Sequence, residues 1–430
     1  MPTEITNYQC PACTGPLHFE AGTDTLCCEY CGSAFGLQEI EALYAQKEAR
    51  AAEQFAKQEA NGDPECEQIA DGMRVYNCPS CGAQLMCDET TAATACPYCG
   101  NPSVVPGQFT GMRKPDHLIP FKLKKEAAVQ AMKKHCEGKT LLPKAFKDEN
   151  HLEELKGVYV PFWLYDCEAD GETNYECTTE SKHRAGDYEI TETAHYKVYR
   201  AGNIELRQIP VDASSKMSDA YMDSLEPFQY DNLTDFSTAY LPGFLADTYD
   251  QDADACEERA KQRAEQTLAN ALKETAVGYR TVSERGREIC VTRKDVSYAL
   301  LPVWLLHTKW NGTDYLFAMN GQTGKFVGDL PIDKRKRRLI FAAVLAACLM
   351  LAGLGFALFG TPEELWEQAA VLALFPLLTA GIWVSVLTAK MKSVFFAREA
   401  AKYVTGELHL TGREDRYTHT TQTRRQIKQK

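Results

Sequence analysis

Two long apolar runs near the C-terminus constrain this chain more than any other feature. Leu339–Phe359 and Ala369–Thr388 hold 21 and 20 residues without a charge, and a nine-residue segment, Gly360–Gln368, separates them. As helices rising ~1.5 Å per residue, both reach ~30 Å, the thickness of the hydrocarbon core of a bilayer. Buried helices of a soluble domain, the alternative, rarely stay apolar on every side over this length. We therefore expect transmembrane helices at 339–359 and 369–388, joined by an external loop at 360–368.

The charged residues that flank these runs predict an orientation. Five consecutive basic residues, Lys334–Arg338, precede the first run, and Lys390 and Lys392 follow the second, whereas the intervening segment holds three Glu and no Lys or Arg. Basic residues remain on the cytoplasmic side of a membrane. We expect a multi-pass protein of the cell membrane with both termini cytoplasmic, a basic juxtamembrane cluster at 334–338 and a basic cytosolic tail at 389–430.

Composition predicts a reducing, aqueous compartment for the residues before the apolar runs. No basic start followed by an apolar segment opens the chain, so we expect no signal peptide. Residues 1–110 hold 15 Asp and Glu against 4 Lys and Arg, which gives this segment a net charge of −11. Such a segment is unsuited to phosphate backbones and to anionic lipid. In a reducing compartment, seventeen cysteines indicate metal binding before disulfides.

Eight of these cysteines form a repeated pattern. Each repeat contains two CxxC pairs with fourteen residues between them, and the second repeat lies 68 residues after the first. Leu17 and Tyr30 recur at the same distance as Leu85 and Tyr98, which indicates duplication of one small module. The candidate metal ligands are Cys10, Cys13, Cys28, Cys31, Cys78, Cys81, Cys96 and Cys99.

This spacing is typical of zinc ribbons. Two CxxC turns present four thiolates to one Zn²⁺ at ~2.3 Å, and four protein ligands leave no coordination position for a substrate. A module of this size buries too little apolar surface to fold without its metal. We therefore expect rubredoxin-like zinc ribbons at 1–38 and 73–108, with two structural Zn²⁺ ions per chain. A thioredoxin-like redox pair and an iron site are weaker alternatives. Cys27 and Cys87 are interpreted as bystanders, with Cys27 placed to compete with Cys28.

The remaining residues before the apolar runs predict a linker and a globular domain. A helix over Glu39–Ala60 in a 39–72 linker is either a solvated spacer or a partner-docking segment, and a soluble α+β domain is expected at 109–333. Apolar residues at helical spacing predict helices at Lys124–Glu137 and Asp252–Thr275. Similar residues surround Pro and Trp in Val158–Tyr165 and Ala299–Leu306, which suggests a duplicated β unit. Strands are expected at Gly157–Asp166, Tyr188–Tyr199, Glu288–Thr292, Tyr298–Thr308, Tyr315–Met319 and Lys325–Asp329.

No set of residues in the chain predicts catalysis. Asn320–Lys325 lacks the spacing of a phosphate loop and fits a hairpin turn better. Asp250–Asp254 begins like a calcium loop, but Ala255 stands where that loop needs Gly. The nine His form no recognisable catalytic order. We therefore expect no catalytic residue, and no cofactor-binding residue apart from the metal ligands.

Several features occur together in this chain: the paired ribbons, the apolar hairpin, Val158–Asp166, Ser224–Phe228, Tyr240–Phe244, Leu301–Trp304 and Asn320–Pro331. In these features the chain resembles a bacterial membrane family described as TFIIB-type zinc-ribbon-containing proteins. Related zinc-ribbon membrane proteins of Gram-positive bacteria resemble the membrane anchors of an envelope-stress module, which recruits an SPFH-type protein and a phage-shock-A-like protein. The resemblance implies a recruiting role and assigns no partner-binding residue.

The expected fold is therefore multidomain, with two ribbons, a soluble α+β domain and a two-helix transmembrane hairpin. The expected function is that of a membrane-anchored adaptor, or scaffold, that presents a cytosolic docking platform to protein partners. Nucleic-acid binding is an alternative, but neither Cys10–Cys31 nor Cys78–Cys99 contains a Lys or Arg for phosphate. An enzyme of unknown reaction at 115–333 is a second alternative, which a deep pocket with shifted pKa values would support. No pattern identifies a small-molecule substrate.

Overall fold

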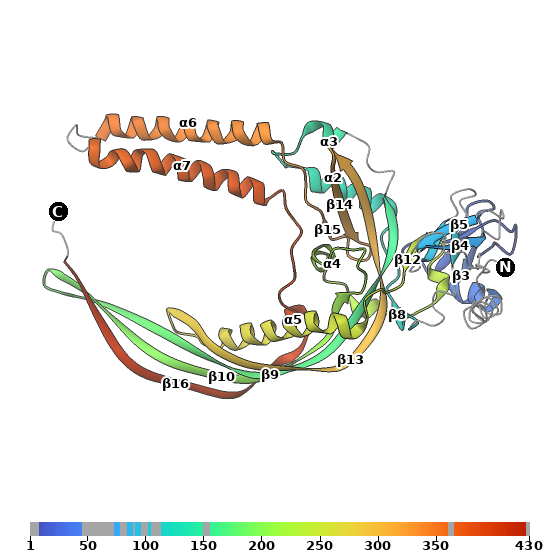
Figure 1. The fold of residues 1–430 in the computed structure, drawn as a ribbon, viewed down its shortest axis with the longest axis horizontal. Coiled ribbons are helices and arrows are strands. Elements are labelled where there is room, and N and C mark those ends of the chain that lie inside the picture. The colour runs from blue at the N-terminus through green and yellow to red at the C-terminus, as the bar shows by residue number, and fades with distance from the viewer. Residues whose placement is uncertain are drawn as a thin grey trace.

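A strongly curved sheet with four very long strands forms the body of the protein (Figure 1). The computed structural model describes residues 8–44, 73–77, 84–88, 91–95, 102–104, 113–148, 155–359 and 365–426. The long strands are β9 (Lys156–Ala185), β10 (Tyr188–Asp212), β13 (Thr281–Trp310) and β16 (Val404–Gln426), and α5 (Ala253–Glu274) covers the concave side of the sheet.

Shorter elements extend this sheet or lie beside it. The N-terminal ones are β1 (Leu17–Phe19), β2 (Thr25–Cys28), β3 (Ala34–Gly36), β4 (Met73–Asn77), β5 (Gln84–Asp88), β6 (Thr91–Ala95) and β7 (Pro102–Val104). The central ones are β8 (His117–Leu118), α2 (Lys125–Cys136), α3 (Lys144–Asp148), α4 (Asp219–Leu225), η3 (Tyr230–Asn232), β11 (Thr234–Asp235), η4 (Thr238–Tyr240), β12 (Leu245–Asp247), β14 (Thr313–Asn320) and β15 (Phe326–Val327). The C-terminal ones are α6 (Lys334–Phe359), α7 (Leu365–Ala389) and η6 (Ala401–Tyr403).

The four long strands follow the order β16–β10–β9–β13, and each is antiparallel to its neighbours. The β9–β10 hairpin turns at Gly186, whose φ of 62° is a conformation that suits glycine. The burial of β9 changes along its length: residues 157–165 are buried on both faces, whereas beyond Cys167 buried and exposed side chains alternate. The expected strand ended at Asp166, because small and polar side chains such as Thr173 occupy the outer part. In the structure the strand continues to Ala185.

The C-terminal residues are part of this sheet. The segment 389–430, expected to be a basic tail, contains β16, which pairs with β10 from Val404 to Gln426. Most side chains of β16 are exposed, so the strand has no buried apolar face and no period-two apolar pattern. That composition is common to polar tails and to solvated edge strands.

The two segments of similar sequence are adjacent in the core. Pro161 of β9 lies opposite Leu300 of β13, and Pro302 lies opposite Tyr159, so Val158–Tyr165 and Ala299–Leu306 are related by a local two-fold axis. This arrangement agrees with a duplicated β unit.

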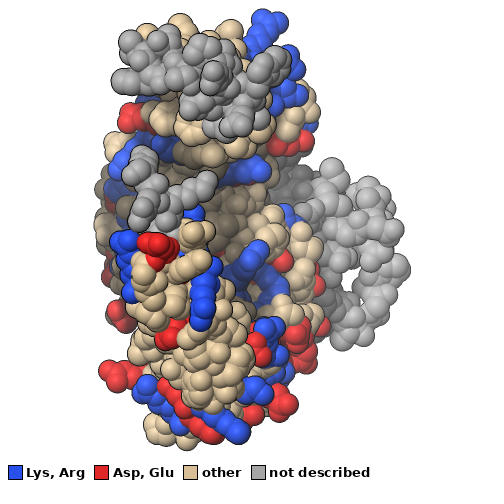
Figure 2. All heavy atoms as spheres, turned by 90° about the vertical axis from the view of Figure 1, so that its left-hand side faces the viewer, with Lys and Arg blue, Asp and Glu red and all other residues tan. Residues whose placement is uncertain are grey.

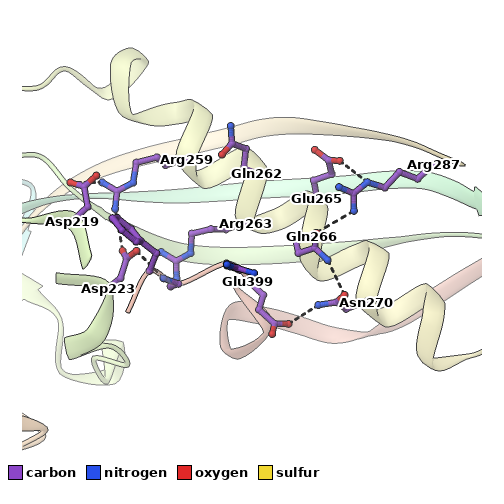
Figure 3. A pocket seen from close by; sticks show the side chains of 13 residues that line it. Asp219, Asp223, Arg259, Gln262, Arg263, Glu265, Gln266, Asn270, Arg287 and Glu399 are labelled. Carbon is purple, nitrogen blue, oxygen red and sulfur yellow. Dashed lines mark hydrogen bonds and ion pairs between the residues drawn. The ribbon is translucent and has the colours of Figure 1, made fainter. Parts of the chain in front are cut away.

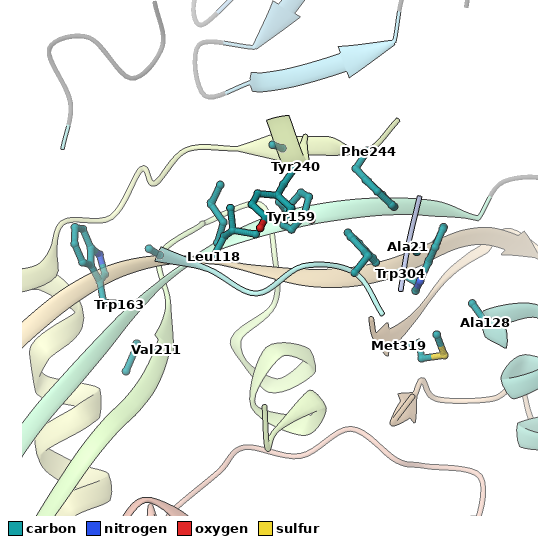
Figure 4. Packing of buried hydrophobic residues seen from close by; sticks show 14 of the residues in the cluster. Ala21, Leu118, Ala128, Tyr159, Trp163, Val211, Tyr240, Phe244, Trp304 and Met319 are labelled. Carbon is teal, nitrogen blue, oxygen red and sulfur yellow. The ribbon is translucent and has the colours of Figure 1, made fainter. Parts of the chain in front are cut away.

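The equivalent tryptophans of these segments have equivalent bonds. Trp163 donates its indole N–H to the carbonyl of Gln251 at 2.9 Å, and Trp304 donates to the carbonyl of Leu123 at 3.0 Å. Buried Trp requires such a partner for its polar edge. Figure 4 shows both rings in the main apolar cluster, together with Tyr159 and Phe244.

The predicted pair of transmembrane helices is corrected by the structure. α6 and α7 pack side by side as an antiparallel pair, and Thr379 of α7 bonds Cys348 of α6 at 3.4 Å. Among the described residues, only Lys334–Leu354 is long and apolar enough to cross a membrane, by length and composition alone. In α7, the described apolar part, Leu374–Ala389, is shorter than such a helix. The prediction of a multi-pass protein of the cell membrane is therefore wrong.

The expected fold class is also wrong. One sheet extends from β7, through β6, β12 and β9, to the C-terminal β16, so no separate α+β domain is flanked by an independent ribbon and a tail. Within this sheet protein, two helices agree with the sequence: the expected Lys124–Glu137 is α2, and the expected Asp252–Thr275 is α5. Of the helix expected over Glu39–Ala60, the structure describes 37–44, and the rest lies outside the described residues.

Candidate metal centre

Four cysteines meet at the first ribbon. The Sγ atoms of Cys10, Cys13, Cys28 and Cys31 all lie within 4.8 Å of one another, and no other group of three or more metal-ligating side chains occurs in the described part of the chain. The Cys10–Cys31 and Cys13–Cys28 sulfur pairs are 3.6 and 3.4 Å apart. A tetrahedron with Zn–S bonds of ~2.3 Å needs sulfurs ~3.8 Å apart, so this set fits a metal ion with small adjustments.

Two tight turns position the four thiols. In the first turn, Thr14 N–H donates to the Cys10 carbonyl at 2.8 Å, and Thr14 has a φ of 58°. In the second turn, Gly32 N–H donates to the Cys28 carbonyl at 2.9 Å, with a φ of 71° that suits glycine. Each turn thus directs one buried and one exposed thiol toward the same point.

The neighbouring thiols alter the pKa values of Cys13 and Cys31. The pKa of Cys13 is raised to about 12: a backbone hydrogen bond from Gly15 lowers it, but the neighbouring Cys31 and Cys28 thiols outweigh that bond. The pKa of Cys31 is lowered to about 6 by hydrogen bonds from the Ser33 side chain and backbone. Four adjacent thiolates require a positive charge between them, and a divalent metal supplies it.

Cys27 is directed away from this set. Its Sγ donates to Glu20 Oε2 at 3.1 Å, and burial raises its pKa, which keeps the thiol protonated. The other four predicted ligands, Cys78, Cys81, Cys96 and Cys99, lie outside the described residues, as does the side chain of Cys87. The structure therefore places one of the two predicted ligand sets.

The first ribbon is joined to the main sheet protein by backbone and aromatic contacts. Phe19 N–H donates to the Pro242 carbonyl at 2.9 Å, and its ring lies 5.1 Å from that of Tyr240. Gly22 N–H donates to the Phe121 carbonyl at 2.8 Å. We call 240–244 together with Phe121 the ribbon seat. The buried side chains of the first ribbon therefore continue the main apolar cluster.

A second group of polar residues, which the sequence did not single out, lines a hollow on the concave side. Its cavity volume is about 690 Å³, and α5, α4 and the segment after α7 line it (Figure 3). Figure 2 views the molecule from its open side and shows Lys and Arg side chains around the hollow between helices and sheet.

Two arginines of α5 organise this hollow. Arg263 binds both carboxylate oxygens of Glu226, at 3.0 and 2.6 Å, and Tyr403 donates to the same carboxylate at 2.8 Å. Arg259 contacts Asp212 and Asp223, both at 3.1 Å. Burial raises the pKa of Asp223 and Glu226, and it raises the pKa of Asp212 to about 7 despite the attraction of Arg259.

The same network holds the connector, residues 390–403 between α7 and β16. Asp223 accepts a hydrogen bond from Ala397 N–H at 2.9 Å, Ser224 from Phe395 N–H at 2.8 Å, and Thr267 from Ala400 N–H at 2.8 Å. In the sequence, Asp223, Ser224 and Thr267 are marked only by their positions next to apolar residues of a helix. Their role depends on the connector, which is distant in the chain.

A deep pocket with shifted pKa values would support an enzyme, and the hollow meets this condition in part, because the pKa of one lining carboxyl group, Asp223, is raised. Its acids, however, are bound by arginine, tyrosine or backbone N–H groups, and no Ser, Cys or His is among its lining residues. This arrangement is that of a structural network rather than of a nucleophile with its base.

Comparison with known proteins identifies a relative. No protein-family model matches the chain, and no solved structure matches it. The chain is 33% identical over 340 residues to the uncharacterized protein YdjG of Bacillus subtilis (strain 168), and this match covers 79% of the chain and 94% of YdjG. The chain therefore belongs to the same family as YdjG.

Proposed function

We propose that this protein is an adaptor that is attached to a lipid bilayer through α6, with α7 packed beside it, and that docks other proteins with its ribbons and sheet. The observation that carries the proposal is the exposed apolar surface of the helix pair. None of the apolar window in Lys334–Leu354 is buried, and Met350 and Leu351 are 70% and 69% exposed. An apolar patch of this size requires an apolar phase or a partner.

The position of basic residues supports attachment at that pair. Lys334–Arg338 forms the first turns of α6, and Lys390 and Lys392 follow α7, so both ends that join the body are basic. Basic residues next to apolar helices bind anionic lipid headgroups. The proposal uses α6 as the apolar attachment and requires no second crossing.

The ribbon supports a docking role. A closed four-cysteine site offers no coordination position for a reaction, and Zn²⁺ is the ion that such sites usually hold. We infer a second ion at Cys78, Cys81, Cys96 and Cys99, because this set repeats the first at the same spacing. Tyr30, between two ligands, is 77% exposed, and exposed aromatic residues are frequent anchors of protein interfaces. On the resemblance described above, the partner is an SPFH-type or phage-shock-A-like protein.

Vesicle flotation tests the attachment. The full chain should float with vesicles that contain phosphatidylglycerol, and the double variant Met350→Asp with Leu351→Asp should remain in the dense fraction. Tyr188→Asp with Tyr417→Asp is the matched control, since these two residues are 46% and 54% exposed on the distant sheet. Equal flotation of both variants, or no flotation of the wild type, would contradict the proposal.

Crosslinking in native membranes followed by mass spectrometry tests the docking role. A protein partner should co-purify with the wild type, and Tyr30→Ser should reduce its recovery by about tenfold if this ring is a central anchor. Val277→Ser, an equally exposed apolar position far from the ribbon, should leave recovery unchanged. The absence of any stoichiometric partner would refute the adaptor role while leaving the flotation result intact.

A further inference from the structure

The sheet has two long open edges. β8 pairs with β13 at Ala299 and Leu300. Before that point, over residues 281–295, β13 pairs with β9 on one side and with no strand in the described part of the chain on the other. β16 likewise pairs only with β10 along all of Val404–Gln426. Each edge presents a row of backbone N–H and C=O groups that a neighbouring strand can bind.

The two edges lie at the same level of the sheet. Pairing across the four strands places Cys290 of β13 in one row with Asp170, Asn203 and finally His409 of β16. The open part of β13 therefore spans the same rows as β16 from Val404 to His419. If neighbouring copies are not shifted far along the strand direction, the β13 edge of one copy meets the β16 edge of the next over this whole length.

The direction of the two edge strands is also compatible. Three successive antiparallel pairings make β13 antiparallel to β16. In a ring of copies that all have the same orientation, β13 of one copy would meet β16 of the next in the antiparallel arrangement that the rest of the sheet uses. A contact between different surfaces of identical subunits closes into a ring when the rotation allows it.

The charges of the edges permit this contact. The β13 edge over 281–295 carries four basic and three acidic residues, and β16 carries four basic and three acidic residues. Neither edge has the single-sign charge that would repel its counterpart, and neither contains a proline.

We propose that copies of this chain assemble head to tail through their sheet edges, with β13 of one copy paired to β16 of the next. The occupant of each edge is thus a second copy. A peptide strand from another protein would occupy only one edge. It would not explain why the β13 and β16 edges lie at the same level and run in opposite directions.

Cysteine crosslinking of the full chain tests this arrangement. Cys290 is exposed on the β13 edge, and His409→Cys places a thiol at the same level on the β16 edge. A short bismaleimide should then give a ladder of covalent trimers and larger species, because every copy has one thiol on each edge. Thr405→Cys and Arg413→Cys cover an axial shift in either direction.

Two controls keep the test specific. Cys290→Ser in the His409→Cys background should abolish the ladder, and Glu176→Cys, exposed on β9 between its two neighbouring strands, should produce none. Covalent dimers that persist without Cys290, and that Cys290→Ser alone does not form, would show a two-fold contact between β16 strands and overturn the proposal. Monomers in all three edge variants would also overturn it.

Particle mass provides an independent measurement. In detergent, the wild type should have several times the chain mass of 48.1 kDa. Glu407→Lys with Thr411→Lys, which makes the β16 edge predominantly basic, should shift it toward the single-chain mass with unchanged circular dichroism. Val277→Lys should keep the larger mass, and a monomeric wild type would refute the proposal.

Discussion

The buried guanidinium of Arg200 donates a hydrogen bond to Asp415, and this contact joins β10 to the last strand of the chain. Arg200 is fully buried, and its Nε also donates to Thr275 at the end of α5 at 3.1 Å. One side chain therefore connects the C-terminal strand, the centre of the sheet and the helix that covers its concave side.

Asp415→Asn should loosen β16. The substitution leaves the buried Arg200 cation without its carboxylate. Because the lost carboxylate is partly exposed, we expect the free energy of unfolding to fall by on the order of 1 to 3 kcal/mol. Hydrogen exchange should accelerate in residues 404–426 more than elsewhere. Glu407→Gln, on the same strand and exposed, is the control, and equal protection in both variants would contradict the role of the pair.

The same pair predicts a loss of stability in acid. The hydrogen bond from Arg200 lowers the pKa of Asp415 below its usual value. A carboxyl group with a lowered pKa in the folded state stabilises the protein above its unfolded pKa of ~3.9, and that stabilisation disappears as the pH falls through the folded pKa. Exchange rates of β16 in the wild type should approach those of Asp415→Asn when measured at decreasing pH near 4, while Glu407→Gln keeps the wild-type profile.

Asp212→Asn should change the pH dependence of unfolding in the opposite direction. Burial raises the pKa of Asp212 to about 7, so the folded state holds this proton more tightly than the unfolded state does. The resulting stabilisation is complete below the unfolded pKa of ~3.9 and is lost as the pH rises through about 7. Between about pH 5 and pH 8 the wild type should therefore lose on the order of 2 kcal/mol relative to Asp212→Asn. Denaturant titrations with Asp231→Asn as control measure this, and parallel profiles would contradict it.

Metal content should follow the two cysteine sets. We expect about two Zn²⁺ per wild-type chain, one in Cys28→Ser and one in Cys81→Ser, because each set closes around a single ion. Cys28→Ser should also uncover the ribbon seat, since its ribbon packs on Tyr240 and Phe121, and should increase binding of a hydrophobic dye. Cys27→Ser is the control, and a metal content unchanged by Cys28→Ser would rule out the first site.

Gly171→Ala should strain the centre of the sheet. A Cβ at this position would lie 2.3 Å from the carbonyl oxygen of Glu288 and 2.6 Å from the Cα of Ile289, both backbone atoms of β13 that cannot move independently. We expect a loss of about 1 to 3 kcal/mol of unfolding free energy. Gly286→Ala, which would meet nothing within 4 Å, should be near neutral, and similar losses for both would refute the explanation.

Sequence patterns predicted the parts of this protein whose interacting residues are close together in the chain. The helix expected at Lys124–Glu137 is α2 at Lys125–Cys136, and the four thiols of the first ribbon meet as their spacing indicated. Asn320–Lys325 is a hairpin turn between β14 and β15, in which the Asn320 side chain accepts from two backbone N–H groups. In each case the interacting residues lie within about 25 positions of one another.

Longer relationships were not accessible from sequence patterns. Expected strands at Glu288–Thr292 and Tyr298–Thr308 are one strand, β13, because polar residues between them pair with β9 on a solvated part of the sheet. The clamp of Glu226, Arg263 and Tyr403 joins three segments up to 177 positions apart. Apolar composition at 339–388 likewise indicated an apolar environment but not how many helices are long enough to cross a bilayer.

The helix pair lies in the chain between the two parts of one sheet, and this order has a consequence for biosynthesis. β10 gains its second neighbour only when β16 emerges, and β16 follows α6 and α7 in the chain. α6 and α7 are translated before that step, so the apolar pair reaches its surroundings while the arm still lacks its final strand. The sheet is therefore completed only after the helix pair has been made, and a stop codon between 390 and 404 would release a chain with β10 as an unprotected edge.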